Sequence, residues 1–202
     1  MRIGVDLNGV IRDYAGQFLK TYKKYVDSDC DIAYDGITSF RMNEVFEFED
    51  PTDYEKFVYE DYAYELFGAA ETMDRTTIPV FNDWTQNTLR NLDVEEDPSV
   101  MIFSPFEMGL TIQSTLAFMS SNMIRCREYY FPVDSKTIYD YCDIVITANP
   151  NLIEACPDGK HVFKIETPYN SSVECENTFK SLIELIRDEN ETITKIIEGR
   201  ND

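Results

Sequence analysis

The sequence has little of several residue types, and each scarcity excludes a class of protein. Its 202 residues include one His and no two cysteines spaced as Cys-x-x-Cys, so we expect five reduced thiols and neither a zinc site nor a disulfide framework. With only 8 Gly and 8 Pro, the chain is not collagen-like or of low complexity. No apolar run approaches the ~20 residues of a spanning helix, and the first residues lack a signal-peptide pattern. These absences predict a cytoplasmic protein that does not bind membranes.

Basic residues are scarce as well. The chain has 18 Lys and Arg against 38 Asp and Glu, which gives a net charge of −20. Because nucleic acids and anionic lipids are bound mainly through basic side chains, we expect no direct binding to nucleic acid. The charge favours solubility, and it also favours partners that carry positive charge. The apolar share of 43% is ordinary for a globular chain and is enough to build one core.

Alternating apolar segments predict an α/β fold. Residues 2–6 form a short predicted strand, which is followed by a turn at Asn8-Gly9 and by a helix that starts after Asp13. Further strands are expected at 99–104, 125–131, 143–147 and 161–165, and helices at 78–92, 110–119 and 179–197. Strands that alternate with helices indicate a parallel sheet. We therefore expect residues 1–27 and 75–202 to form one core.

Residues 28–74 interrupt this pattern and predict an inserted helical cap. From Glu44 to Glu71 there are ten acidic residues and one basic residue, Lys56, a local net charge of −9. Eight aromatic residues lie among them at spacings that favour one or two short helices with an aromatic inner face: Phe46, Phe48, Tyr54, Phe57, Tyr59, Tyr62, Tyr64 and Phe67. This acidic, aromatic cap is the best candidate surface for a protein partner with a basic patch.

Polar residues close three of the predicted strands. They are Asp6, Ser104 and Thr147, and in open parallel sheets ligands lie beyond these carboxyl ends. The run Asp6-Leu7-Asn8-Gly9-Val10 resembles the first motif of the haloacid dehalogenase (HAD) superfamily of phosphohydrolases, Asp-x-Asp-x-Thr/Val. Ser104 resembles the hydroxyl of the second motif, and Lys136 resembles the lysine of the third. The resemblance implies a HAD-like Rossmannoid fold, a three-layer parallel sheet with an inserted α-helical cap.

The order of the later motifs resembles that of one branch of this superfamily. Lys136 lies a few residues before the strand that begins near Asp143, which is similar to the 5′(3′)-deoxyribonucleotidase branch. Asn149-Pro150 and the segment from Lys164 to Asn170 are similar to compact nucleotidase-like proteins that bacteriophages often encode. A phage origin would place the protein in the host cytoplasm or in the virion. The resemblance covers roughly residues 1–27 and 99–170.

The resemblance also assigns roles to individual residues. It implies that Asp6 is the nucleophile and that Ser104 and Lys136 bind phosphate. Asn8 takes the place of the general acid, a function that an amide cannot perform near neutral pH. Each residue also has a structural interpretation, in which Asp6 caps a helix or pairs with Lys136, Ser104 is a strand-end hydroxyl and Asn8 forms a turn. If Asp6 and Lys136 face each other, the pair could still bind a small ligand.

The family's metal site is also altered in this sequence. In the family, Mg²⁺ is held by the first Asp, by a backbone carbonyl and by carboxylates that end the fourth strand. The corresponding groups here are Asp6, the Asn8 backbone carbonyl and Thr147, so a hydroxyl replaces a carboxylate ligand. We therefore expect Mg²⁺ to bind weakly or not at all. The loss of the cation and of the proton donor together predicts a degenerate catalytic set.

Other titratable residues are weaker candidates. Asp143 starts the fourth strand and is too far from its end, whereas Asp13 and Glu107 lie where either could reach the loop face. The single histidine, His161, begins a predicted strand and is interpreted as structural.

Three functions remain open from the sequence. The first is a degenerate nucleotidase-like protein that acts through binding or structural interaction, the hypothesis we favour. The second is an active Mg²⁺-dependent phosphohydrolase of nucleoside monophosphates with Asp6 as nucleophile. The third is an acidic inhibitor that mimics nucleic acid, which needs carboxylates spaced like phosphates along one face.

Overall fold

The strands form one parallel sheet. The computed structural model describes residues 1–92, 94, 95, 97–189 and 191–199, and within them the sheet has six strands in the order β3-β2-β1-β4-β5-β6. Every neighbouring pair is parallel. The strands are β1 (Arg2–Asp6), β2 (Ser99–Phe103), β3 (Glu128–Tyr130), β4 (Ile144–Thr147), β5 (His161–Ile165) and β6 (Thr178–Phe179). The predicted α/β class with a parallel sheet is thus confirmed, although β6 is too short to leave a sequence signal.

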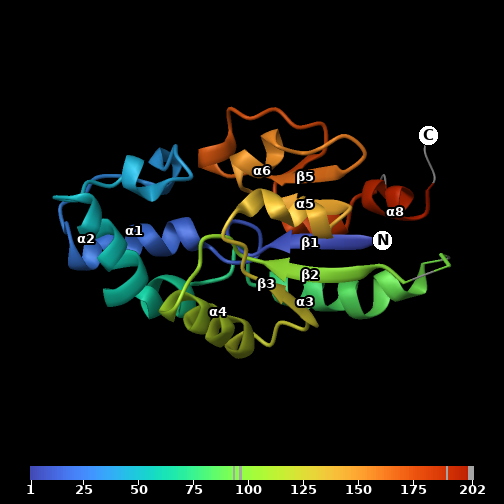
Figure 1. The fold of residues 1–202 in the computed structure, drawn as a ribbon, viewed down its shortest axis with the longest axis horizontal. Helices are drawn as coiled ribbons and strands as arrows, with labels where there is room; N and C mark the ends of the chain where they lie inside the picture. Colours follow the sequence, from blue (N-terminus) through green and yellow to red (C-terminus); the bar gives the residue numbers. More distant parts are fainter. Residues whose placement is uncertain (93, 96, 190, 200–202) are drawn as a thin grey trace.

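Helices cover both faces of the sheet, which explains why its strands are continuous apolar runs. On one face, Ile3 and Val5 belong to the main core together with residues of α3 (Thr77–Asp83), α7 (Leu182–Ile186) and α8 (Thr192–Ile197). On the other face, Phe103 and Val145 pack with α5 (Ile138–Tyr141) and α6 (Pro150–Glu154), which lie in front of the sheet in Figure 1. The molecule therefore has three layers.

Helix α1 (Tyr14–Tyr25) starts where the sequence analysis places it. The side chain of Asp13 accepts a hydrogen bond from the Gly16 amide at 2.9 Å, which satisfies one of the free N–H groups of the first turn. Phe18 and Tyr22 face the core, and basic residues follow in the last turn, where they suit the helix dipole. Helix α4 (Leu110–Ser121) likewise covers the predicted segment.

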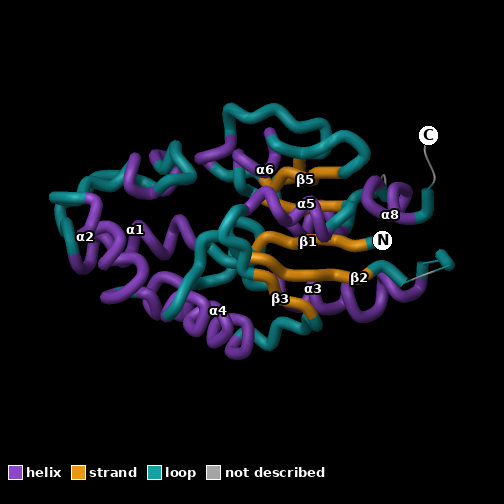
Figure 2. The backbone as a smooth tube through the Cα atoms, viewed as in Figure 1, coloured by secondary structure: helices purple, strands orange, loops and turns teal. Residues whose placement is uncertain are grey.

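Residues 28–74 lie beyond the carboxyl ends of the strands and consist of helices, turns and loops, as Figure 2 shows. Helix α2 (Pro51–Lys56) continues into a π-helical segment, Phe57–Asp61, and a second π-helical segment spans Tyr64–Gly68. Seven of the eight aromatic side chains named above are buried or half-buried, and Tyr64 is exposed. Nine of the ten acidic residues from 44 to 71 are exposed, so the cap has an aromatic interior and an anionic exterior.

Two predicted helices differ from the structure. The segment 78–92 is α-helical only to Asp83 and continues as π-helical and 3₁₀ turns to Asn91. The single helix predicted over 179–197 is wrong, because Phe179 pairs with Ile165 in β6 and two short helices follow. The break between them places Glu191 in the left-handed region with φ +53°, which a continuous helix cannot contain. None of the described helices is long and apolar enough to cross a bilayer.

Candidate functional site

The three predicted strand-end residues meet at one edge of the sheet. Strand β1 lies between β2 and β4, and the chain proceeds from it to either side, so β1 marks the point where the strand order reverses. Asp6 ends β1, Thr147 ends β4, and Ser104 follows the last residue of β2. Helix α1 and, from residues 28–74, helix α2 lie beyond the tips of the strands and cover this edge (Figure 1). The fold therefore places these residues where ligands of such sheets bind.

The Asp6 carboxylate is enclosed by the protein. Its residue is 1% exposed, and its Oδ2 accepts a hydrogen bond of 2.6 Å from the Thr147 hydroxyl. Its Oδ1 accepts a longer hydrogen bond of 3.3 Å from the backbone N–H of Asn8. Burial raises the pKa of Asp6 to about 7, and the hydrogen bond from Thr147 opposes this rise. Near neutral pH part of the Asp6 population is therefore protonated, and a protonated carboxyl is a poor nucleophile.

The Asn8 side chain is bonded to its neighbours. Its amide nitrogen donates to the Ser104 hydroxyl at 3.2 Å, and its Oδ1 accepts from the Arg12 Nε at 2.8 Å. The adjacent turn requires glycine, since Gly9 has φ +76° and a Cβ there would lie 2.2 Å from the Tyr169 hydroxyl oxygen. Asn8, which stands where the resemblance places a general acid, thus links the turn to the neighbouring strand end.

A buried ion pair between Arg12 and Glu107 occupies the same edge. The guanidinium donates to Glu107 Oε1 at 2.6 Å, with the two side chains 0% and 1% exposed. It also donates to the Phe67 carbonyl at 3.0 Å and to the Thr115 hydroxyl at 2.6 Å. The Ser104 hydroxyl donates to the same Glu107 oxygen. The predicted phosphate-binding hydroxyl is therefore already bonded to a carboxylate of the chain itself.

Lys136, the predicted third-motif lysine, does not reach Asp6. It lies in a 3₁₀ turn, Ser135–Thr137, where its backbone amide bonds to Asp134, and its side chain is exposed. Within the described part of the chain its ammonium makes no hydrogen bond or ion pair, so the Asp6–Lys136 pair considered above is not formed. The positive charge that acts on Asp6 is that of Arg12, which lowers the Asp6 pKa.

Of the four weaker candidates named in the sequence, only one lies at the strand-end site. Asp143 bonds to the Arg2 amide and to Lys160, and His161 pairs in register with Ile144, so both lie at the opposite end of β4 from Thr147. Asp13 caps α1, whereas Glu107 does reach the loop face.

The residue that sequence reasoning missed is Arg12. It is the only charged residue between Asp6 and Asp13, and it lies next to the apolar pair Val10-Ile11, which is a weak sign of a buried charge. Its partner Glu107 is 95 positions away, so no local spacing connects them.

Beside Asp6, the structure has the hydroxyl of Thr147 where the resemblance implies a carboxylate ligand for Mg²⁺. Within the residues that the structure describes, no group of three His, Cys, Asp or Glu side chains lies close enough to hold a metal ion. Mg²⁺ prefers six oxygen ligands with near-octahedral geometry, usually including one or two carboxylates. Here the Thr147 hydroxyl directs its proton to Asp6, and the Glu107 carboxylate at the same edge is paired with Arg12. Weak Mg²⁺ binding stays a prediction, which a substitution experiment below addresses.

A pocket of about 270 Å³ adjoins the site on the cap side. Asn8 and Glu107 form part of its wall, and aromatic residues from α1 and the cap form much of the rest: Tyr14, Tyr54, Tyr59 and Phe67. It is slightly smaller than the ~300 Å³ at which pockets for drug-sized ligands begin. The space between cap and core therefore suits a small molecule.

Comparisons with known proteins support the fold alone. No protein-family model matches the chain, and no curated protein matches it in sequence. Among solved structures, the chain is similar to a candidate haloacid dehalogenase-like hydrolase from Burkholderia xenovorans LB400, with a TM-score of 0.61 and 7% sequence identity. The match covers 95% of this chain and 97% of that one. The chain thus has a HAD-like α/β fold, as its strand-end motifs predict.

Proposed function

We propose that this chain is a HAD-like protein that no longer transfers phosphoryl groups and acts by binding. The observation that carries the proposal is the closed set of bonds among Asp6, Thr147, Asn8, Ser104 and the Arg12–Glu107 pair. Three of the four side chains that the resemblance assigns to catalysis, Asp6, Asn8 and Ser104, are bonded to other residues of the chain. We also infer, from the order of its motifs, descent from the 5′(3′)-deoxyribonucleotidase branch and a bacteriophage source.

Phosphoryl transfer by a carboxylate needs three things, and this site supplies none of them fully. The nucleophile must be ionised, whereas burial raises the Asp6 pKa to about 7. A proton donor must serve the leaving group, and its loss typically costs 10²–10⁴-fold in rate. A cation must offset the charge of the phosphate, and the nearest one, Arg12, is held by Glu107. The combined loss supports a role without phosphatase activity.

The proposal is tested by an assay of phosphate release. Purified protein with Mg²⁺ and a panel of deoxynucleoside monophosphates should release no more phosphate than the Asp6→Asn variant, which keeps the side-chain shape. Release that depends on Asp6 would overturn the proposal and favour the active phosphohydrolase. Thermal unfolding of both proteins shows whether the variant is folded.

Restoring the family's carboxylates tests the missing metal site. The double substitution Asn8→Asp with Thr147→Asp should produce Mg²⁺ binding that isothermal titration calorimetry detects, because it adds two hard oxygen ligands beside Asp6. A matched control, Thr88→Asp with Asn91→Asp, adds the same two charges at exposed positions and should leave Mg²⁺ binding unchanged. Equal binding by both double variants would show that positions 8 and 147 do not form one metal site.

The charge of the cap supports binding to a basic protein. The acidic residues from 44 to 71 are almost all exposed, and Lys56 is the only basic residue in that range of the sequence. Such a surface attracts positively charged partners and speeds their association. We therefore expect the affinity for a protein partner to fall as the salt concentration rises.

A further inference from the structure

The exposed apolar side chains gather around the edge strand β3. Of the thirteen large hydrophobic residues that are exposed in the described part of the chain, eight lie between residues 106 and 141, a segment that includes α4, β3 and α5. Five of these eight flank β3 or follow it, and we call them the edge patch: Leu116, Met123, Tyr129, Val133 and Tyr141. They are 39% to 90% exposed. Apolar groups that gather on one surface in this way mark interaction sites.

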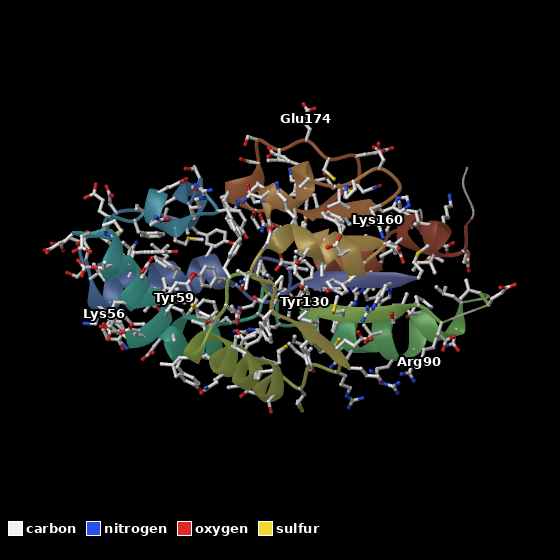
Figure 3. The ribbon with its side chains drawn as sticks, in the orientation of Figure 1. Lys56, Tyr59, Arg90, Tyr130, Lys160 and Glu174 are labelled. Atoms are coloured by element: carbon white, nitrogen blue, oxygen red, sulfur yellow. The ribbon has the colours of Figure 1, made fainter. Side chains whose placement is uncertain are left out.

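The edge patch continues from one covering layer of the sheet to the other through Tyr129. Together with Tyr129, Leu116 and Met123 line a hollow on the side of α4. Tyr141 and Tyr129 line a second hollow on the side of α5. Tyr130, the neighbour of Tyr129 in β3, lies far along the molecule from Lys56 of the cap in Figure 3, so this surface is separate from the cap.

The backbone of β3 is open on its outer side. β3 ends the sheet in the strand order given above, with β2 as its neighbour. The Ser104 amide donates to the carbonyl of Tyr130 at 3.0 Å, so the carbonyl of Tyr130 faces the side of β2. Because successive residues of a strand turn their backbone groups to alternate sides, Tyr129 turns its N–H and C=O outwards. An edge of this kind is a template for one more strand.

This part of the chain is also nearly neutral. Residues 106–141 contain four acidic and three basic residues, a net charge of −1, whereas the whole chain carries −20. Two of the acidic residues, Glu107 and Glu128, form ion pairs with Arg12 and Arg2. Molecules of so acidic a protein repel one another, and the repulsion is weakest where nearly neutral surfaces meet. The charge therefore favours contact between two copies at this edge rather than at the cap.

The charges beside β3 complement those of an antiparallel copy. Arg125 and Arg127 precede the strand, and Asp134 is the first charged residue after it. All three side chains are exposed, and neither arginine forms an ion pair with another described residue. In an antiparallel pair, the start of each strand lies against the end of the other, so the arginines of one copy lie near the aspartate of its partner. A parallel pair would bring like charges together.

We propose that two copies of this chain associate through β3, with the two strands antiparallel about a two-fold axis at Tyr129. In this register the two Tyr129 residues exchange two backbone hydrogen bonds, and the sheet continues from one copy into the other. The two edge patches cover each other. The acidic caps, which lie beyond the carboxyl ends of the strands, point in opposite directions and remain free, so the inference is independent of the function proposed above.

Analytical ultracentrifugation between about 1 and 100 µM tests the proposal. The wild type should form a dimer with twice the chain mass of 23.5 kDa. A monomer over the whole range would overturn the proposal. Assemblies larger than a dimer would overturn it as well, because a two-fold contact is closed after two copies.

Charged substitutions show whether the edge patch is the contact. Met123→Glu should raise the dissociation constant of the dimer at least about tenfold, because the two-fold axis brings two unpaired charges into one apolar contact. Val133→Asp, at a position that is 90% exposed, should act in the same direction and replaces the first variant if that one does not fold. Tyr64→Glu, at an exposed position in the cap, is the matched control. Patch variants that dimerise as well as this control would overturn the proposal.

The substitution Tyr129→Cys tests the register. The Cα atoms of an opposed, hydrogen-bonded antiparallel pair lie about 5.5 Å apart, which a disulfide can span. Mild oxidation should therefore link two copies of this variant, as non-reducing electrophoresis detects, whereas Tyr64→Cys should stay unlinked. The five natural cysteines are the same in both variants. Linkage of Tyr129→Cys no greater than that of Tyr64→Cys would overturn the two-fold pairing at Tyr129.

Discussion

The buried carboxyl group of Asp6 makes the stability of the folded protein depend on pH. Its pKa of about 7 in the folded protein lies above the ordinary value of 3.8, because burial disfavours the charged form. The folded state therefore holds this proton more tightly than the unfolded state does. Its contribution to stability is fully present below about pH 4 and is lost as the pH rises to about 7.

We predict that Asp6→Asn removes this pH dependence. The stability of the wild type relative to Asp6→Asn should fall between about pH 4 and pH 7 by up to about 4 kcal/mol, at about 1.4 kcal/mol per pKa unit. Urea unfolding of both proteins across this range measures the difference in their free energies of unfolding. The other carboxyl groups titrate in both proteins, so their contributions cancel in this difference. Parallel stability profiles would show that Asp6 is not buried in its charged form.

The Arg12–Glu107 pair makes a second prediction at the level of single residues. Arg12→Met leaves Glu107 buried without its cation and should cost about 3–5 kcal/mol, whereas Arg12→Met with Glu107→Leu should cost less than the sum of the two single substitutions. A double-mutant cycle from urea unfolding gives the coupling, which we expect to be at least about 2 kcal/mol. Additive effects would mean that the two side chains do not pair in solution.

Helix α1 depends on the residue that precedes it. The Asp13 carboxylate lies close to the first turn of α1, and a Cβ at Gly16 would be 2.2 Å from Asp13 Oδ2. The glycine therefore leaves room for the carboxylate that caps the helix. We predict that Asp13→Ala destabilises the protein by about 1 kcal/mol, because the Gly16 amide loses its acceptor. Thermal unfolding measures this loss, and Asp158→Ala, at an exposed turn position, serves as the control. An equal loss in the control would contradict the capping role.

Most strands and helix α1 could be predicted from the sequence, but some helix ends and breaks could not. The segments 2–6, 99–103, 144–147 and 161–165 were predictable because a strand buried on both faces must be apolar throughout, and α1 because its apolar stripe is clear. The break near Glu191 was not, since apolar residues on both sides of it keep a helical spacing. At the site, Asp6, Ser104 and Thr147 could be placed because strand ends of a parallel sheet meet. The Arg12–Glu107 pair could not, because only the fold brings these two residues together.

The whole molecule carries far more negative than positive charge. With a net charge of −20, the like charges on the folded protein repel one another and lower its stability. Most of the acidic residues of the cap are exposed, so dissolved salt screens this repulsion. We predict that the melting temperature rises by several degrees when NaCl is raised from about 0.02 to 0.5 M, as the Debye length falls from about 20 Å to 4 Å. Differential scanning calorimetry measures this shift, and sucrose at equal osmolality is the control. An unchanged melting temperature in NaCl would show that repulsion does not limit stability.

Arg12 has one more consequence. Its guanidinium is bonded at once to the cap, through the Phe67 carbonyl, to α4, through Thr115, and to the loop after β2, through Glu107. Movement of residues 28–74 away from the core would break the bond from Arg12 to Phe67, and movement of α4 or of the loop after β2 would break the others. A ligand that reaches this edge without breaking these bonds must therefore be small.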